Sequence, residues 1–252
     1  MLKTRIIPTL LFKNYGLVKG VTFNSWRRVG SALPSIKVYN TRQVDELILV
    51  DIAATQEERT IDYEEIDTLA DECFMPMTVG GGIKDIDDVR NILRAGADKV
   101  SINSGAIQNP NLISTVASFF GSQCVVVSID VKKNGNGGYE VYSCSGSKSE
   151  GIHPVYWAKE VEKKGAGEIL LTSIDRDGTM TGYDIELISS ITDAVSIPVI
   201  ASGGAGNYEH MVEAILIGKA SAVAAASIFH FTQQTPLEAK QYLASKGIRT
   251  RL

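Results

Sequence analysis

The sequence predicts a single (β/α)8 barrel that spans residues 1–252. Short runs rich in Val and Ile alternate along the chain with amphipathic stretches of helical period. The short runs are apolar on both faces, which is typical of parallel strands that are covered by helices. Eight strand–helix units of about 31 residues each account for the whole length, and no Pro- or Ser-rich linker divides it.

The elements follow in a regular order. The expected strands are 5–11, 46–52, 76–80, 99–103, 124–130, 168–173, 197–202 and 222–226. The expected helices are 31–41, 63–73, 86–95, 110–119, 154–164, 185–194, 208–218 and 237–246. After the fifth strand, the turn-rich stretch 134–138 is followed by the alternating residues 139–142, which indicates a small inserted hairpin.

The two halves of the sequence resemble each other. Residues 45–51 are similar to 167–173, and 76–82 are similar to 198–204, both at an offset of 122 positions. Residues 101–104 match 224–227 at an offset of 123. Because three separated segments keep nearly the same offset, we expect two similar half-barrels of four units each.

Composition and charge exclude several classes of protein. The chain is 44% apolar and 21% charged, with a net charge of −4, which argues against a general nucleic-acid binder. No apolar run approaches the roughly 20 residues that span a bilayer. The first residues lack the layout of a signal peptide, so we expect a cytoplasmic protein. Cys73, Cys124 and Cys144 are an odd, widely spaced set, which fits reduced thiols better than a disulfide framework or a zinc site.

Each half carries the same pair of features at the ends of two strands. Glycines follow one strand, and a small or polar pair follows the next strand just before a helix. Glycines let the backbone approach a ligand, and a helix start favours an anion. We therefore expect two phosphate-binding sites on opposite sides of the barrel mouth, which suits a ligand with a phosphate at each end. The first site comprises Gly80, Gly81, Gly82, Asn103 and Ser104, and the second comprises Gly203, Gly204, Ala226 and Ser227.

Acidic residues follow other strands at the same end of the expected barrel. Asp51 ends the second strand, Asp130 ends the fifth, and Asp177 follows the sixth. The carboxyl ends of barrel strands form the catalytic face, and an Asp there can act as a general acid or base. The three histidines do not have the spacing of a metal site, and His230 lies in an apolar segment typical of a structural histidine. The sequence thus implies neither a metal nor an organic cofactor.

Six strings identify a family. The chain resembles the cyclase subunit of imidazole glycerol phosphate synthase over nearly its whole length, and the matching strings are 78–83, 94–103, 121–126, 175–179, 201–207 and 225–231. The resemblance implies a barrel that receives ammonia from a glutaminase partner. In the family, ammonia attacks a ribulosyl aminoimidazole carboxamide nucleotide that bears two phosphates, giving imidazole glycerol phosphate and an aminoimidazole carboxamide ribotide. The resemblance also implies that Lys19, Asp177, Gly178 and Ser202 help to bind the ligand.

The opposite end of the barrel matches the family too. The family closes its ammonia entrance with a ring of charged side chains, and those positions here are Arg5, Glu46, Lys99 and Glu168. Two charges of each sign can neutralise one another, which makes their burial tolerable. Asp98 matches a family position that faces the glutaminase.

The chain departs from the family at the end of the first strand. The family has catalytic aspartates at the ends of strands one and five; Asp130 matches the second, but Leu11 occupies the first. The internal repeat pairs the same two residues at an offset of 119. Thr9 stands where a Cys is usual. A leucine cannot transfer a proton, so cyclase chemistry lacks one of its two usual carboxylates.

Three hypotheses about function remain. The residues around Leu11, together with 74–76, are similar to cyclase-like proteins of bacterial surface-glycan clusters. The preferred hypothesis is therefore an ammonia-conducting subunit that works with a glutaminase and a sugar amidotransferase in acetamidino-sugar synthesis. The alternative is the cyclase subunit of histidine biosynthesis. The third is a phosphate-binding barrel with an unrelated isomerisation, which would need no ring of charges.

Overall fold

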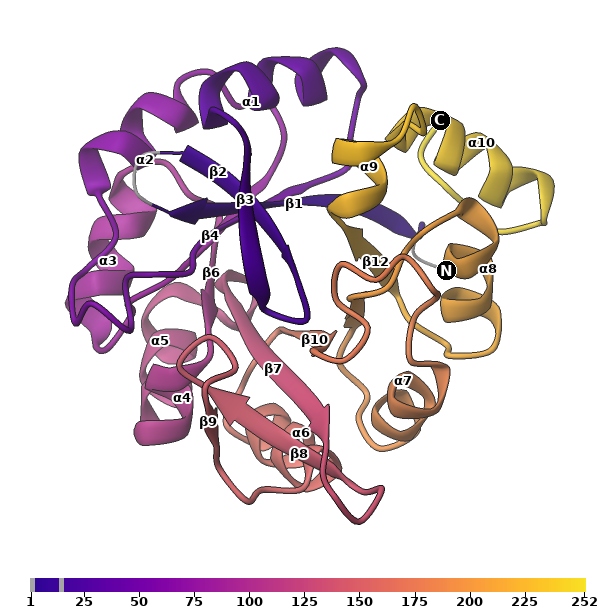
Figure 1. Ribbon diagram of the computed structural model, residues 1–252. Helices are drawn as coiled ribbons and strands as arrows, with labels where there is room; N and C mark the ends of the chain where they lie inside the picture. Colours follow the sequence, from indigo (N-terminus) through magenta and orange to yellow (C-terminus); the bar gives the residue numbers. More distant parts are fainter. Residues whose placement is uncertain (1–2, 14–15) are drawn as a thin grey trace.

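Eight parallel strands pair edge to edge and close into a barrel, because the last strand of the series pairs with the first (Figure 1). The structure is a computed structural model that describes residues 3–13 and 16–252. Residues 1–2 and 14–15, which the expected domain 1–252 includes, lie outside the described residues. In order around the barrel the strands are β1 (Arg5–Lys13), β4 (Leu47–Asp51), β5 (Met77–Gly80), β6 (Lys99–Ile102), β7 (Val125–Lys133), β10 (Glu168–Ser173), β11 (Val199–Ser202) and β12 (Ala222–Ala225).

Helices surround the barrel and cover its outer face (Figure 1). One main helix follows each barrel strand, as the sequence predicts, and only the ends differ by a few residues. These helices are α1 (Ala32–Thr41), α2 (Tyr63–Ala70), α3 (Ile86–Arg94), α5 (Asn111–Phe120), α6 (Pro154–Lys163), α7 (Ile185–Thr192), α8 (Tyr208–Leu216) and α10 (Pro236–Ser245). The prediction of a (β/α)8 barrel is confirmed.

Side-chain caps fix where several helices begin. Asp85 accepts the backbone N–H groups of Asp87 and Asp88 at the start of α3, and Asp88 bonds back to the backbone of Asp85. Thr235 and Glu238 form the same reciprocal pair at the start of α10. Such boxes satisfy backbone donors that an isolated helix end leaves unpaired, so the local sequence sets these boundaries.

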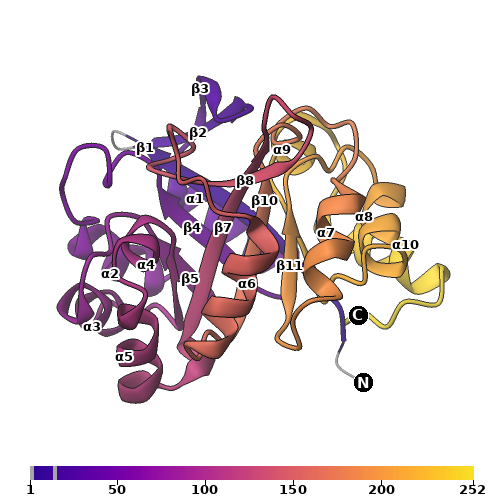
Figure 2. The same ribbon diagram turned by 90° about the horizontal axis from the view of Figure 1, so that it is seen from below.

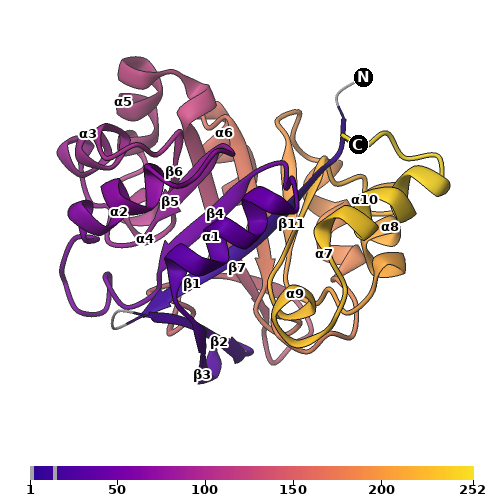
Figure 3. The ribbon, with the colours of Figure 1, turned by 90° about the horizontal axis from the view of Figure 1, so that it is seen from above.

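Two hairpins stand above one end of the barrel (Figure 2). β7 continues into a hairpin with β8 (Tyr139–Ser143), which also pairs with β9 (Lys148–Ser149), so the predicted insertion is confirmed. A second hairpin was not predicted: β2 (Gly16–Val21) pairs with the end of β1 and with β3 (Asn24–Gly30). Both hairpins lie at the carboxyl ends of the barrel strands, whereas the termini lie at the opposite end (Figure 3).

Short helices follow two strands in equivalent positions of the two halves. α4 (Ser104–Gln108) follows β6, and α9 (Ser227–Phe231) follows β12. A helix start was expected at both places, but neither short helix was predicted as a separate element, because five residues are too few to show a helical period. A single 3-10 turn, η1 (Ser122–Cys124), leads into β7.

Two separate sets of apolar side chains hold the fold together. The larger set packs between the outer face of the strands and the helices. The smaller set fills the inside of the barrel, so the barrel is a packed core and not an open tube. Its members are Ile7, Ile48, Val126, Leu170, Ile200, Ala222 and Ala224.

A buried ion pair joins the two ends of the chain. Lys240 of α10 is 2% exposed, and its Nζ lies 2.8 Å from Oδ1 of Asp45. Asp45 also accepts the backbone N–H of Ile6 in β1, and Lys240 donates to the carbonyl of Gln43. The last helix is thereby fixed against the first two strands of the barrel.

Candidate functional site

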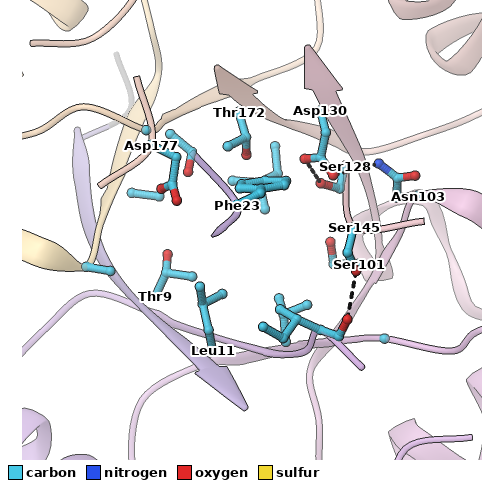
Figure 4. A pocket seen from close by; sticks show the side chains of 18 of the residues that line it. Thr9, Leu11, Phe23, Ser101, Asn103, Ser128, Asp130, Ser145, Thr172 and Asp177 are labelled. Carbon is cyan, nitrogen blue, oxygen red and sulfur yellow. Dashed lines mark hydrogen bonds between the residues drawn. The ribbon is translucent and has the colours of Figure 1, made fainter. Parts of the chain in front are cut away.

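The main pocket opens at the carboxyl ends of the barrel strands, beneath the two hairpins (Figure 4). It brings together both predicted phosphate sites and the acidic residues that were predicted to face the mouth. The predicted site residues that line it are Leu11, Lys19, Asp51, Gly81, Gly82, Asn103, Ser104, Asp130, Asp177, Gly178, Ser202, Gly203, Gly204, Ala226 and Ser227.

The first predicted phosphate site is built from the turn after β5 and the start of α4. Gly82 has a φ of +68°, and a Cβ there would lie 2.4 Å from the carbonyl oxygen of Arg59. A side chain at this position would therefore need both backbone strain and a shift of the neighbouring loop. Ser104 accepts the backbone N–H of Cys144 from the β8–β9 hairpin, so this hairpin helps to enclose the site.

The second site repeats this construction after β11 and at the start of α9. Gly204 has a φ of +112°, and a Cβ would lie 2.1 Å from the carbonyl oxygen of Gly182. The Ser227 hydroxyl is buried and has no hydrogen-bond partner among the described residues. An unpaired buried hydroxyl is costly, which favours a polar ligand at this position.

Asp130 is the carboxylate whose surroundings suit proton transfer. Burial raises its pKa to about 7, and the nearby Asp177 carboxylate adds to the rise, whereas hydrogen bonds from Ser128 and Thr172 oppose it. The Ser128 hydroxyl lies 3.3 Å from Oδ1, and Nδ2 of Asn103 donates to Oδ2 at 3.0 Å. A carboxyl group with a pKa near neutrality can both release and accept a proton.

The other two predicted acids are held in ion pairs. Asp51 bonds to the guanidinium of Arg59 at 2.6 Å and also accepts the backbone N–H groups of Ala53 and Ala54. Asp177 lies 2.6 Å from Nζ of Lys19, which is 2% exposed. Their contacts therefore favour structural and positioning roles, in contrast to Asp130.

Leu11 faces the pocket from β1, as the internal repeat predicts. It pairs with Val50 of β4 on one side and with Val18 of β2 on the other. Figure 4 shows Leu11 and Asp130 on opposite sides of the pocket. The position equivalent to Asp130 in the first half is therefore apolar in three dimensions as well as in the sequence.

Sequence analysis did not identify several residues that line the pocket. Phe23 and Trp26 reach it from the β2–β3 hairpin, and Ser145 comes from the turn between β8 and β9. Nothing in the local sequence marks these three, because their place depends on how the hairpins fold over the mouth. Ser128 could have been found, since it lies two residues before Asp130 at the predicted strand end and alternate side chains share a face; Thr172 also lines the pocket from β10.

The four charged residues at the opposite end form a closed ring of ion pairs. Arg5 lies 2.8 Å from Glu46 and 3.0 Å from Glu168, while Lys99 lies 3.2 Å and 2.9 Å from the same two carboxylates. The four side chains are between 10% and 21% exposed. The structure therefore brings together all four residues that sequence analysis assigned to a ring.

Asp98 lies at this same end. Its Oδ2 accepts the backbone N–H of Met77 at 2.8 Å, so the side chain fixes the entry into β5. Phe74, Phe119 and Ile217 are exposed in segments that lead into barrel strands, which places them at the amino ends of the strands.

The described residues hold no group of three or more His, Cys, Asp and Glu that could bind a metal ion. Within the same ranges, 3–13 and 16–252, no helix is long and apolar enough to cross a membrane. His230 is largely buried, which lowers its pKa.

Comparison with known proteins now identifies the family. The model of the family "Histidine biosynthesis protein" matches residues 5–235. The chain is 51% identical over 253 aligned residues to the imidazole glycerol phosphate synthase subunit HisF of Caulobacter vibrioides, in strains NA1000 and CB15 alike. The match covers 100% of this chain and 97% of each relative. The chain belongs to the HisF family.

This result corrects the preferred functional hypothesis. The assignment to acetamidino-sugar synthesis depended on short strings near Leu11 and on residues 74–76. Identity of 51% to HisF over the full length outweighs those strings and favours the histidine-pathway alternative. The expectation of a sugar amidotransferase partner rests on the overturned hypothesis and is not retained. Leu11 is accordingly a substitution within a HisF chain.

Proposed function

We propose that this HisF chain is the cyclase subunit of an imidazole glycerol phosphate synthase. It uses ammonia to close the imidazole ring of a ribulosyl aminoimidazole carboxamide nucleotide and releases imidazole glycerol phosphate and the aminoimidazole carboxamide ribotide. The observation that carries the proposal is the pocket itself, in which two similar glycine-and-helix sites flank Asp130, a buried carboxyl group that is not held in an ion pair by any described residue. A substrate with a phosphate at each end would place its central part against Asp130.

The two phosphate sites provide binding by backbone groups and hydroxyls. Gly82 with Ser104 would hold one phosphate, and Gly204 with Ser227 would hold the other. Lys19 provides a positive charge beside the mouth while it is held by Asp177. Because the backbone supplies much of each site, we expect both to survive changes in the side chains that perform chemistry.

Asp130 would carry the proton transfers. With a pKa near 7, the carboxylate can take a proton at one step of ring closure and return it at a later step. Leu11 leaves the opposite wall without a proton donor, so this single group serves twice. Asn103 and Ser128 hold the two carboxylate oxygens in place.

Ammonia would come from a glutaminase subunit docked at the amino ends of the strands. Phe74, Phe119 and Ile217 are exposed in segments that lead into barrel strands, and Asp98 lies at the same end of the barrel, which supports a protein interface there. The ring of Arg5, Glu46, Lys99 and Glu168 would act as the gate through which ammonia enters the barrel.

The test is turnover of the ribulosyl nucleotide with an ammonium salt, in the chain alone, with Asp130→Asn as the comparison. We expect measurable wild-type turnover and a loss of roughly 10²–10⁴-fold in the variant, the usual value of general acid–base assistance. Asn keeps the size of the side chain, so the nucleotide should still bind. Wild-type turnover at the level of the uncatalysed reaction would refute the proposal.

A further inference from the structure

Two aromatic side chains of the β2–β3 hairpin line the pocket, and they pack differently. Phe23, at the turn, packs against the other hairpin, since a Cβ on Gly146 would lie 2.7 Å from its ring. Trp26, on β3, packs against its own hairpin, since a Cβ on Gly20 would lie 2.8 Å from Cε3 and 3.1 Å from Cδ2 of the indole. Trp26 is only partly buried and lines the pocket, so part of its surface is open to a ligand.

Contacts with two other segments hold this hairpin above the mouth of the barrel (Figure 2). The backbone N–H of Thr22 donates to the carbonyl oxygen of Asp177 at 2.8 Å. Arg27, next to Trp26 in the sequence, lies with its guanidinium carbon 3.7 Å from the centre of the Phe231 ring at the end of α9. The strand that carries the indole is therefore fixed before a ligand binds, which lowers the entropic cost of binding.

The rest of the pocket offers no other aromatic surface among the described residues. Apart from Phe23 and Trp26, the side chains that line it are aliphatic, hydroxyl, amide or charged, and several positions are glycine. The glycines and helix starts suit phosphates, and Asp130 suits proton transfer. A planar ring in the ligand can therefore stack only on the hairpin. Of the two aromatic residues there, Phe23 already shares the space around Gly146 with Ile174.

We propose that Trp26 is a positioning residue whose indole stacks on the aminoimidazole carboxamide ring of the nucleotide; this inference rests on the proposed function. Before ring closure this ring is the aromatic group of the substrate, because the ribulosyl arm is an open chain. Stacking uses the faces of both rings and requires no hydrogen bond between them. The stack holds the carboxamide ring at the mouth, while the ribulosyl arm extends towards Asp130.

The first experiment measures binding by calorimetry in wild type, Trp26→Leu and Trp26→Phe. The two ligands are the aminoimidazole carboxamide ribotide and ribose 5-phosphate, which lacks the aromatic ring. In Trp26→Leu we expect the Kd for the ribotide to rise about 5- to 100-fold, the value of one stacked base, and the Kd for ribose 5-phosphate to change by less than about twofold. Trp26→Phe keeps an aromatic face and should remain within about fivefold of wild type for both ligands.

A second measurement uses Trp26 as the reporter of its own stacking. The chain has one other tryptophan, Trp157, which is 4% exposed in α6. The ribotide should quench the tryptophan fluorescence of the wild type. The quenching should remain in Trp157→Phe and disappear in Trp26→Phe, although the ribotide still binds to that variant. A role limited to packing within the hairpin would not produce this pattern.

Steady-state kinetics separate the two substrates of the proposed reaction. In Trp26→Leu the KM for the nucleotide should rise with the Kd for the ribotide, because both ligands carry the same ring. The KM for ammonium, measured at saturating nucleotide, should stay within about twofold, because the indole does not contact ammonia. A rise confined to ammonium would contradict the inference.

Three binding results would also overturn it. They are an unchanged ribotide Kd in Trp26→Leu, an equal loss of ribotide and ribose 5-phosphate, and quenching that persists in Trp26→Phe. Thermal unfolding is the folding control, and if Trp26→Leu does not fold, the fluorescence of Trp26→Phe and Trp157→Phe still decides. Trp26-dependent ribotide binding without wild-type turnover would refute the proposed function and leave the stacking site. Turnover without such binding would refute the inference alone.

Discussion

The two halves of the barrel share a scaffold but differ in the chemistry at equivalent strand ends. β7 ends its inward row with Asp130, which is surrounded by Asn103 and Ser128. The equivalent residue of β1 is Leu11, whose neighbour across the strand pair is Val50. One wall of the pocket is therefore polar and titratable, and the opposite wall is apolar.

The two predicted phosphate sites do not show this difference. Gly82 and Gly204 both have positive φ and both lie against a backbone carbonyl. Such a site depends on the shape of the backbone, and a side chain at either glycine would change that shape. The two halves therefore remain alike there. Proton transfer depends on a single side chain, and one substitution is enough to confine it to one half.

The largest expected effect comes from making the two walls alike. Asp130→Leu should lower kcat/KM by roughly 10²–10⁴-fold, because it removes the remaining proton-transfer group. Binding of inorganic phosphate at the second predicted site should change much less, because none of Gly203, Gly204, Ala226 and Ser227 is hydrogen-bonded to this carboxylate, whereas Asn103 links it to the first site. Steady-state kinetics and calorimetric phosphate titrations measure the two quantities. Equal loss of both would mean that the scaffold and the chemistry are not separable.

The raised pKa of Asp130 should make the free energy of unfolding depend on pH. Burial raises its pKa from 3.8 to about 7, so the folded protein holds this proton more tightly than the unfolded chain. The resulting stabilisation is complete below about pH 4 and is lost as the pH rises through about 7, by up to about 4 kcal/mol. Asp130→Asn lacks this titration. Its advantage in unfolding free energy over wild type should therefore grow between pH 4 and pH 8, and a constant difference would contradict the raised pKa.

The charged ring lies at the end of the barrel opposite the pocket, and its effect on ammonia transfer can be tested separately. Lys99→Ala leaves Glu46 and Glu168 with Arg5 as their shared partner in the ring. Opposite charges within hydrogen-bond distance stabilise the closed ring, and this variant loses the contacts of Lys99. In a complex with a glutaminase, we therefore expect the ratio of glutamine-driven to ammonium-driven turnover to fall about fivefold. Lys99→Arg, which keeps the charge, is the matched control. A ratio that falls equally in both variants would indicate a requirement for the shape of lysine.

The smallest expected effect comes from giving the first half its carboxylate. In Leu11→Asp, a second negative charge faces Asp130 across the pocket and disfavours its ionised form. The pKa of Asp130 should rise further, which moves the ascending limb of the pH–rate profile to higher pH by about one unit or less. Leu11→Asn is the uncharged control and should leave the limb in place. A wild type near background with a large gain in Leu11→Asp would mean that cyclisation had been lost from this chain.

The sequence predicted the barrel because local patterns repeat eight times and each is set by neighbouring residues. Capping pairs such as Thr235 with Glu238 fix helix starts without help from distant parts of the chain. The glycine pairs and the pairing of Leu11 with Asp130 were also visible, because the internal repeat aligns the halves. The β2–β3 hairpin, in which Leu17 pairs with Gly30, was not predicted. Its two strands lack the clear alternation of polar and apolar side chains that marks a strand in the sequence.

The sequence by itself determined the fold, the glycines and helix starts at two pairs of strand ends, and the absence of a carboxylate at the end of the first strand, all of which follow from residue type and spacing. Family comparison, not local motifs, decided between the two functions that those features allow. Only the tertiary structure decided that Asp51 and Asp177 are held in ion pairs and that Asp130 has a pKa near 7. The physical reason is that burial and hydrogen bonding depend on side chains from distant strands, which meet only when the barrel closes.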